Sequence, residues 1–469
     1  MALLSLSNSA FLVLASQIFG GACRASKRIF CLVILSSIKS IIDPKLNKYG
    51  VLVTCFISIL FVQKFNLSGK GIRMFLKHPR SLKLTLLQVF LATTTFLSLA
   101  ASSHALAQAT QSPFPRQMAW TAYNLGSTGY NQAVAIGAML REKFGVTLRV
   151  IPGQNDVSRL LPLKTGRVDF TLNGVSTYFA QEGMFQFANE QWGPQPVRLL
   201  MTSNGLSNQT VGVAADIGVE EIADLRGRRI PYVRGAPALN ISMEAYLACG
   251  NLTWDDVVRV EFPGYDAAWN GVINGNVDAG FGTTVSGPMY RVEASPRGIF
   301  WPPAPHDDQG CWERMLAIGP YFTKHYATRG AGIDPNSPHE AGTYPYPMLT
   351  ALSNQDENLV RALTQAIHEN YDDFKDSDPG AIGWALDRQV FQWVVPYHDG
   401  AVHYWREIGI WTEELEQHNN SLVERQEVLA SAWSEFIEEE IDDQQEFLEA
   451  WKRLRALRLE ETGFNPVWH

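Results

Sequence analysis

Cysteine is scarce in this 469-residue sequence, which has five, and three of them lie within residues 1–107. The chain has no CxxC, HExxH or paired-cysteine spacing, so nothing supports a zinc or other transition-metal site. It also lacks the GxSxG elbow of serine hydrolases, the GK[ST] end of a P-loop and the GxGxxG dinucleotide fingerprint. We therefore expect a protein that is not an enzyme and that holds no metal or cofactor.

An excess of basic residues is also missing from most of the chain. Residues 1–107 contain twelve Lys and Arg and one acid, Asp43, whereas residues 108–469 contain 27 basic and 46 acidic residues. A nucleic-acid-binding surface needs a basic face, so an acidic body argues against a nucleic-acid partner. The length and the 46% hydrophobic content are typical of a globular chain of roughly two or three domains.

The basic N-terminal part has the layout of a secretory signal peptide, which we predict over about residues 74–107. A basic segment precedes an uncharged run and a small-residue cleavage pattern, at 77–83, 84–101 and 105–107. Cleavage there would leave a periplasmic body that begins at Gln108. The absence of a cysteine near Ala107 argues against a lipid-tethered protein.

The segment before the signal has two interpretations. Met74 stands where an initiator would, so residues 1–73 are expected to be a mis-assigned start. The alternative is real membrane segments at 3–19 and 51–62, of which the second is short of the roughly 20 residues that a spanning helix needs. We exclude residues 1–107 from the fold prediction.

The body contains a weak internal repeat. Gly126 and Gly235 are 109 residues apart, Pro152 and Pro263 are 111 apart, and the G-x-V-D phrases that end in Asp169 and Asp278 are again 109 apart. In each copy strands alternate with helices, which predicts parallel sheets covered on both faces and two α/β lobes. Ligands of open α/β sheets bind beyond the carboxyl ends of the strands, so a small molecule is expected in the cleft between the lobes.

The repeat gives the expected elements and boundaries. The first copy has a helix over 131–144 and strands over 146–151 and 168–172; the second has strands over 229–233 and 257–262 and a helix over 240–249. Strands over 197–201 and 210–214 cross between the lobes, and 347–352 returns. We predict lobe 1 over 117–205 and 347–411, and lobe 2 over 206–346.

The segment 412–469 is charged and predicted to be helical. Its apolar residues form an intermittent stripe, at Leu415, Leu422, Leu429, Trp433, Phe436, Trp451 and Leu454. Such a stripe favours an amphipathic tail helix that packs on the first lobe. A helix that forms a homodimer or binds a partner is the alternative.

Two turns are the strongest candidates for ligand binding. The first, residues 126–131, combines glycines with the start of a helix, where free backbone amides and the helix dipole favour an anion. The second, residues 234–237, would present another helix start from lobe 2. Two such turns facing one cleft suit a ligand with two anionic ends.

Polar residues that follow strands complete the predicted site. Amide and hydroxyl side chains at strand ends can orient a small polar ligand, although turn formation and capping explain each one singly. The predicted ligand-binding residues are Gly126, Ser127, Thr128, Gly129, Tyr130, Asn131, Asn155, Asn173, Ser176, Arg234, Gly235, Ala236, Asn240, Thr283, Thr284 and Ser286. Asp169 and Asp278 start strands at the opposite end, so turn formation is their expected role.

Other polar or reactive residues are expected to be structural. His306, Asp307 and Asp308 lie among prolines, which predicts an exposed loop, and His398 and His403 lie beside aromatic residues. One disulfide between Cys249 and Cys311 is permitted in an exported body, but nothing in the sequence brings them close. Two free buried thiols are therefore the expectation.

Several phrases, taken in order, resemble the TAXI-type solute-binding receptors of TRAP (tripartite ATP-independent periplasmic) transporters. The resemblance covers about residues 118–411. It is carried by the segments 126–130, 163–169, 222–230, 341–344 and 395–401, with Tyr404 close behind. It implies a type II periplasmic-binding-protein fold and an exported receptor that closes on a small organic solute, typically an amino acid such as glutamate or a dicarboxylate, and presents it to ion-gradient-driven permease subunits.

The resemblance maps the 126–131 turn, Asn155, Ser176, the 235–240 turn and the 283–286 segment onto the ligand cleft. This chain departs from the family at Tyr130-Asn131, at 238–240 and in its longer tail, which puts the ligand's identity in doubt more than the fold. The alternatives are an enzyme on the same two-lobed fold and a receptor for an ATP-driven permease.

Overall fold

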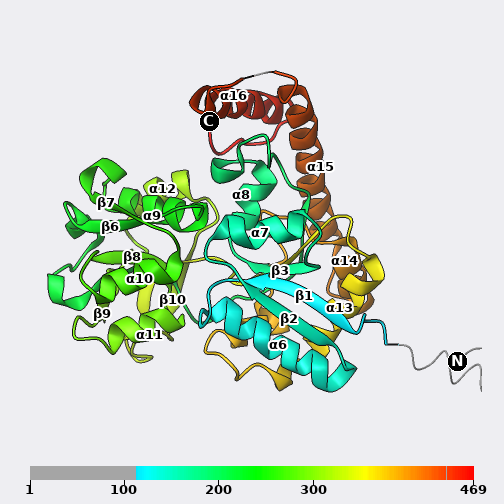
Figure 1. Ribbon diagram of the computed structural model, residues 1–469, viewed down its shortest axis with the longest axis horizontal. Coiled ribbons are helices and arrows are strands. Elements are labelled where there is room, and N and C mark those ends of the chain that lie inside the picture. The colour runs from blue at the N-terminus through cyan, green and yellow to red at the C-terminus, as the bar shows by residue number, and fades with distance from the viewer. Residues whose placement is uncertain (1–111, 440) are drawn as a thin grey trace, which may run out of the picture. The chain divides into compact units, whose positions relative to one another are not determined.

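The structure is a computed structural model that describes residues 112–439 and 441–469. These residues form two α/β lobes and a pair of helices that packs on the first lobe (Figure 1). The predicted signal peptide, start and membrane segments lie outside the described residues.

The first lobe is built on a five-stranded sheet with the order β2-β1-β3-β12-β4. β1 is parallel to β2 and β3, and β12 is antiparallel to both β3 and β4. The strands are β1 (Gln117–Ala122), β2 (Thr147–Pro152), β3 (Phe170–Asn173), β4 (Val197–Thr202) and β12 (Met348–Leu352). The helices are α6 (Thr128–Phe144), α7 (Asp156–Lys164), α8 (Ser176–Glu182), α13 (Glu357–Glu369) and α14 (Asp399–Glu407).

The second lobe repeats this strand order. β5 is antiparallel to β8 and β9, and β6 is parallel to β7. The Asp278 amide, just before β8, donates to the Arg229 carbonyl of β6 at 2.8 Å, so β8 lies beside β6 and the order is β7-β6-β8-β5-β9. The strands are β5 (Gln209–Ala214), β6 (Arg229–Val233), β7 (Val258–Phe262), β8 (Ala279–Thr283), β9 (Ile299–Phe300), β10 (Thr323–Ala327) and β11 (His339–Thr343). The helices are α9 (Pro237–Cys249), α10 (Tyr265–Ile273), α11 (Gly287–Glu293) and α12 (Gln309–Ile318). The predicted type II periplasmic-binding-protein architecture is confirmed.

The two G-x-V-D aspartates have the same role in the two lobes. The Asp169 carboxylate accepts the Ala119 amide at 3.0 Å, and the Asp169 amide donates back to the Ala119 carbonyl at 2.9 Å. Asp278 makes the same pair of bonds with Arg229, at 2.9 and 2.8 Å. Each aspartate therefore joins the start of one strand to its parallel neighbour, away from the carboxyl ends where a ligand is expected.

The cysteine pair differs from its prediction. Cys249, the last residue of α9, forms a disulfide with Cys311 in the first turn of α12. The prediction of two free thiols is therefore wrong. The bond closes a segment with a sequence separation of 62 and fixes these two helices of lobe 2 to each other.

Reduction of this disulfide is expected to lower the free energy of unfolding by about 2–4 kcal/mol, since it removes a restraint on the unfolded chain. Urea denaturation with and without reductant measures the change. A Cys249→Ser, Cys311→Ser double variant serves as the control, because reductant should not move its midpoint. Equal midpoints for the oxidised and reduced wild type would contradict the prediction.

The tail forms two helices instead of one, α15 (Glu413–Phe436) and α16 (Gln444–Glu461), because Asp443 caps a new helix start by accepting the Glu446 amide at 2.8 Å. Three residues of the predicted apolar stripe, Leu429, Phe436 and Trp451, are buried inside the protein.

A buried ion-pair triad joins the tail to the first lobe. The Glu182 carboxylate, at the end of α8, accepts two hydrogen bonds of 2.8 Å from the Arg425 guanidinium of α15. It also forms an ion pair with Arg455 of α16. The Glu182 and Arg455 side chains are both fully buried. Burial would raise the pKa of Glu182, but the two guanidinium groups outweigh it and lower this pKa.

Trp468 reaches from the tail to the second lobe. Its ring packs against Tyr178 and Phe185 of the first lobe, with centroid distances of 5.1 and 5.2 Å. Its indole Nε1 donates to the carbonyl of Ile318, at the end of α12 in the second lobe, at 3.1 Å.

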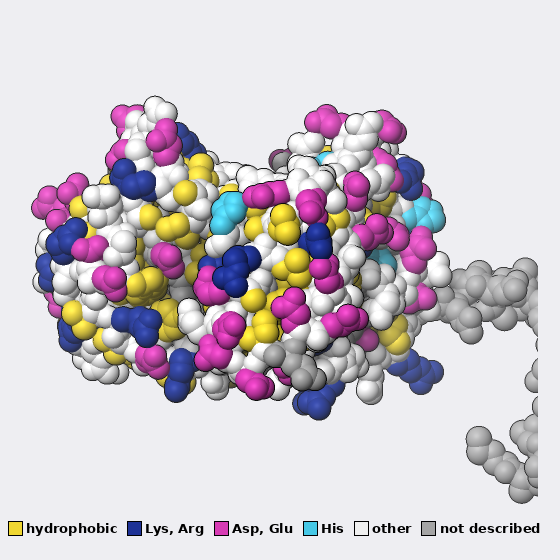
Figure 2. Space-filling view, turned by 90° about the horizontal axis from the view of Figure 1, so that it is seen from above, with side chains coloured by type: hydrophobic (Ala, Val, Ile, Leu, Met, Phe, Trp, Pro, Cys, Tyr) yellow, Lys and Arg dark blue, Asp and Glu magenta, His cyan; other side chains and the backbone are white. Residues whose placement is uncertain are grey.

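The surface mixes charges of both signs. Figure 2 shows basic, acidic and hydrophobic side chains interspersed over one face of the described residues, with no continuous basic stripe. No helix of residues 112–439 and 441–469 is long and apolar enough to cross a bilayer.

Candidate functional site

The two lobes meet at a seam where helix starts face each other. The amides of Asp156 and Val157, at the start of α7, donate to the Gly235 carbonyl of lobe 2 at 3.0 and 3.2 Å. The Tyr265 amide, at the start of α10, donates to the Gln154 carbonyl of lobe 1 at 3.2 Å. These cross-lobe bonds show that the structure is closed along this seam.

Two glycines of lobe 2 let the lobes approach. A Cβ atom on Gly287 would overlap the carbonyl oxygen of Gly126 in lobe 1, and a Cβ atom on Gly264 would lie 3.1 Å from Gln154. In both cases the three nearest atoms belong to the other lobe. A side chain at Gly287 would therefore obstruct closure, and one at Gly264 would crowd Gln154.

The first predicted turn hydrogen-bonds the side-chain carboxylate of Asp378. Gly126 has a φ of 77°, and the Ser127 hydroxyl caps α6 by accepting the Tyr130 amide at 3.3 Å. The side chains of Thr128 and Asn131 donate to Asp378, the second of them at 3.2 Å.

Gly129 of the same turn faces the hydroxyl of Tyr346, which lies 3.1 Å from where a Cβ atom would be. The start of α6 is thus covered by Asp378 and Tyr346.

The second predicted turn receives a carboxylate from the opposite lobe. Asp156 accepts the Ala238 amide, in the first turn of α9, at 2.8 Å. The Asn155 side chain donates to the Arg234 carbonyl at 3.1 Å, so it also joins the lobes. Gly235 and Ala236 precede this helix start. The anion expected at the start of α9 is therefore supplied by the chain itself.

Arg159 contacts Asp156 of the seam and is absent from the predicted residues. It is buried, pairs with Asp156 and lies over the Tyr123 ring at 4.1 Å. Its Nε atom and the Tyr123 hydroxyl have no hydrogen-bond partner among the described residues. Burial raises the pKa of Tyr123 well above its usual value, and nearby Asp156 adds to this. The signal in the sequence that could have indicated a buried Arg159 is its position one helical turn after Asp156 and next to the apolar Leu160.

The residues after β3 form a local network. The Ser176 hydroxyl donates to the Asn173 side-chain oxygen at 2.7 Å. The Asn173 Nδ2 atom and the Thr177 hydroxyl are buried and have no partner among the described residues, so both are free to bind a solute or water.

The predicted residues of lobe 2 are engaged in structure. Asn240 fixes the turn before α9 through two 2.9 Å bonds to the Val233 backbone, and Ser286 stands at the N-cap of α11. Thr283 donates to Gln209 at 2.8 Å.

Thr284 has a positioning role of its own. Its hydroxyl donates to the Arg329 carbonyl and its carbonyl accepts the Ala331 amide, both at 2.9 Å. Thr284 therefore holds the loop that carries Arg329.

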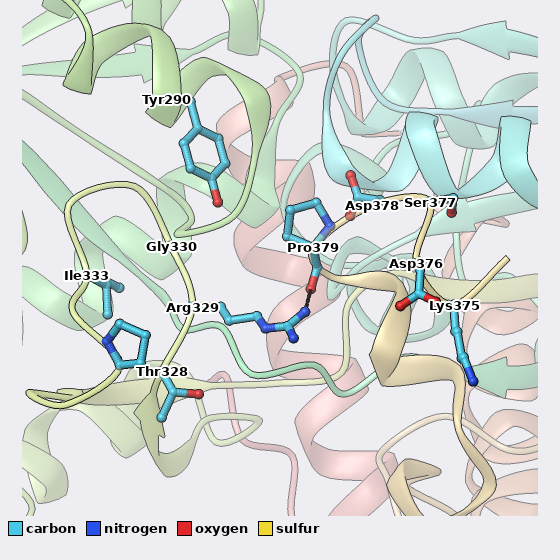
Figure 3. A pocket seen from close by; sticks show the side chains of 11 residues that line it. Tyr290, Thr328, Arg329, Gly330, Ile333, Lys375, Asp376, Ser377, Asp378 and Pro379 are labelled. Atoms are coloured by element: carbon cyan, nitrogen blue, oxygen red, sulfur yellow. Dashed lines mark hydrogen bonds between the residues drawn. The ribbon is translucent and has the colours of Figure 1, made fainter. Parts of the chain in front are cut away.

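A cavity of about 450 Å³ lies between the lobes (Figure 3). Lobe 2 contributes α11 and the 328–335 loop, and lobe 1 contributes the 375–379 loop. Its lining includes Tyr290, Arg329, Ile333, Lys375, Asp376 and Asp378. Its size falls within the range of small-molecule sites. None of the predicted ligand-binding residues is among the described residues that line this cavity. Two of them contact its lining loops: Thr284 hydrogen-bonds the loop that carries Arg329, and Asn131 hydrogen-bonds Asp378.

The charges around the cavity are of both signs. Within the described part of the chain Arg329 forms no ion pair, and its Nη1 atom lies 3.5 Å from the Pro379 carbonyl across the lobes. Lys375 pairs with Asp372 at 2.6 Å, whereas Asp376 is exposed and has no ion-pair partner among the described residues. Burial raises the pKa of Tyr290, and Arg329 opposes this shift. The arrangement can hold a carboxylate at Arg329 and a cationic group at Asp376.

The remaining polar candidates are structural. Asp308 caps α12 by accepting the Cys311 amide at 2.9 Å, and His306 packs on Tyr326 with a centroid distance of 4.5 Å. His398 caps α14. The part of the chain that the structure describes contains no group of three or more His, Cys, Asp or Glu that could hold a metal ion.

The model of the NMT1-like family matches residues 122–409, which is more than half of the chain. The chain belongs to the NMT1-like family. The match covers both lobes and ends before the helices α15 and α16. No curated protein matches this NMT1-like chain at a significant level.

Solved structures that resemble this NMT1-like protein include several with a small molecule bound. A protein of R. palustris solved with adipate has 14% identity and a TM-score of 0.39, with 68% of this chain and 97% of that chain covered. An ancestral arginine-binding protein bound to arginine has 12% identity and a TM-score of 0.37, with 58% and 98% covered. A periplasmic binding protein from Brucella ovis with glutathione bound has 14% identity and a TM-score of 0.35; 54% of this chain and 66% of that chain are covered.

Proposed function

We propose that this NMT1-like protein is a periplasmic solute-binding receptor of a TRAP transporter. It would capture a small organic solute with a carboxylate, an amino acid such as glutamate or a dicarboxylate. The observation that carries the proposal is the cavity of about 450 Å³ between the lobes, lined by Arg329 of one lobe and Asp376 of the other. The sequence resemblance supports the TRAP route and the predicted signal peptide supports export.

Closure of the lobes gives the mechanism. A solute shifts an open–closed equilibrium only through contacts that it makes better in the closed state. A solute carboxylate on Arg329 and an amino group on Asp376 would touch both lobes at once. Such bridging contacts exist only after closure, so they favour it.

Binding is tested by thermal shift and native mass spectrometry with a panel of amino acids and dicarboxylates that includes L-glutamate and succinate. We expect at least one of them to stabilise the wild type. Arg329→Gln should weaken that binding about tenfold or more, because a charge-assisted hydrogen bond is lost. Arg167→Gln, which removes an exposed arginine of lobe 1, is the matched control. Stabilisation by no member of the panel, or equal affinities of the two variants, would contradict the proposal.

The transport route has a separate test. Solute uptake by cells that contain the receptor and its permease subunits should stop when a protonophore and a sodium ionophore collapse the ion gradients while ATP is maintained. Uptake that continues under these conditions would favour a receptor for an ATP-driven permease.

A further inference from the structure

Asp378 occupies a site that has the chemistry of a carboxylate-binding site. Its side chain is buried, although the residue lines the inter-lobe cavity. One carboxylate oxygen accepts from the Thr128 hydroxyl, from the Gln132 side-chain amide at 3.0 Å and from the Gly380 backbone amide at 2.9 Å. The other oxygen accepts from the Asn131 side chain at 3.2 Å.

These four donors, which we call the cradle, are fixed in place by the fold. The Trp384 indole donates to the side-chain oxygen of Gln132 at 2.8 Å, which turns the Gln132 amide nitrogen toward Asp378. A Cβ atom on Gly380 would lie 2.7 Å from that nitrogen, so only glycine permits the close approach. A preorganised set of neutral donors at the start of a 17-residue helix stabilises a negative charge.

Two of the four cradle donors, Thr128 and Asn131, belong to the turn in which the sequence predicts an anionic group of the ligand. In the structure that group is a carboxylate of the chain. We propose that Asp378 is a specificity-determining residue: it fills the cradle in place of a solute carboxylate, lines the cavity, and has a second carboxylate oxygen with one hydrogen bond, from Asn131.

This oxygen accepts one bond from Asn131, so it retains a lone pair for another donor. The inference about the solute rests on the proposed function. A solute would then place its carboxylate at Arg329 and its cationic or hydrogen-bond-donating end at the 376–378 loop, where Asp378 adds to the negative charge of Asp376. A dicarboxylate that directs its second carboxylate toward the cradle meets a like charge and binds less well.

Chemical rescue tests the cradle without any knowledge of the solute. Asp378→Ala leaves a space that acetate fits, with the four donors around it. We expect this variant to have a lower melting temperature than the wild type and to recover it in acetate or formate but not in chloride at equal ionic strength. The matched control is Asp376→Ala, which removes an exposed carboxylate two residues away on the same loop. If Asp378→Ala does not fold, Asp378→Ser is used, because it leaves most of the same space.

Each outcome decides the matter. Acetate-specific stabilisation of the Asp378 variant alone supports the cradle. Equal stabilisation of the wild type and of Asp376→Ala, or no stabilisation of any protein, overturns it. Asp378→Asn keeps the shape and removes the charge, so its ratio of succinate affinity to glutamate affinity should rise about tenfold; an unchanged ratio overturns the specificity role. Acetate rescue together with binding of no solute in the panel would refute the proposed function and leave the cradle standing.

Discussion

Replacing Glu182 by glutamine is expected to lower the free energy of unfolding by about 3–5 kcal/mol, because it leaves two buried guanidinium groups without their counter-ion. Arg425 and Arg455 both pair with this carboxylate, and the Arg455 side chain is fully buried. Glutamine keeps the size of the side chain, so the loss reports the charge. Urea denaturation followed by circular dichroism measures the change.

The matched control is Glu435→Gln, which removes a half-exposed partner of Arg458 on the surface of the same tail. We expect a much smaller change there, as for most exposed ion pairs. Since the folded-state pKa of Glu182 is lowered, the difference between wild type and Glu182→Gln should be present above about pH 4.5 and disappear as the pH falls through the lowered pKa. Similar losses for the two variants would show that the buried triad does not anchor the tail.

Replacing Gly287 by alanine is expected to hold the two lobes apart. The added methyl group would overlap the Gly126 carbonyl oxygen of the other lobe, whereas nothing in its own lobe is among the nearest atoms. Alanine is a good helix former at the start of α11, so lobe 2 should keep its stability. Small-angle X-ray scattering should give a larger radius of gyration than for the wild type. The affinity for any solute that stabilises the wild type should fall more than tenfold, because closed-state contacts are lost.

Gly310→Ala is the control for this variant. A Cβ atom on Gly310 would meet the end of the Arg314 side chain, which can move aside, and no atom of the other lobe is among the nearest. We expect its scattering curve and solute affinity to match the wild type. If Gly287→Ala scattered like the wild type and bound the same solute as tightly, the seam would not be the contact that forms on closure.

The fold was predictable because its signals are local and repeated. The two G-x-V-D phrases mark equivalent strand starts, and Asp169 and Asp278 make the same pair of backbone bonds in the structure. Glycine turns and helical spacing placed α6 and α9 within three residues of their observed starts. The break between α15 and α16 is not predicted, because Asp443 is one of many charged residues in the tail and its capping role does not stand out in the sequence.

The candidate site was predictable only in part, because its key contacts join distant residues. The turn at 126–131 is where an anion binds, but nothing near it in the sequence shows that Asp378 supplies the anion. The same holds for Asp156 at the start of α9, and for the disulfide, whose cysteines have a sequence separation of 62. Whether the solute touches the predicted turns directly stays a prediction.

Trp468 connects the tail to both lobes. Its ring packs against aromatic side chains of the first lobe, and its indole Nε1 donates to the Ile318 carbonyl of the second. A rotation of the lobes must therefore either break that hydrogen bond or separate the ring from its aromatic neighbours. Under the proposed function we therefore expect the Trp468 contacts to slow opening of the lobes, so that the rate of solute release would depend on a segment outside the family-matched region.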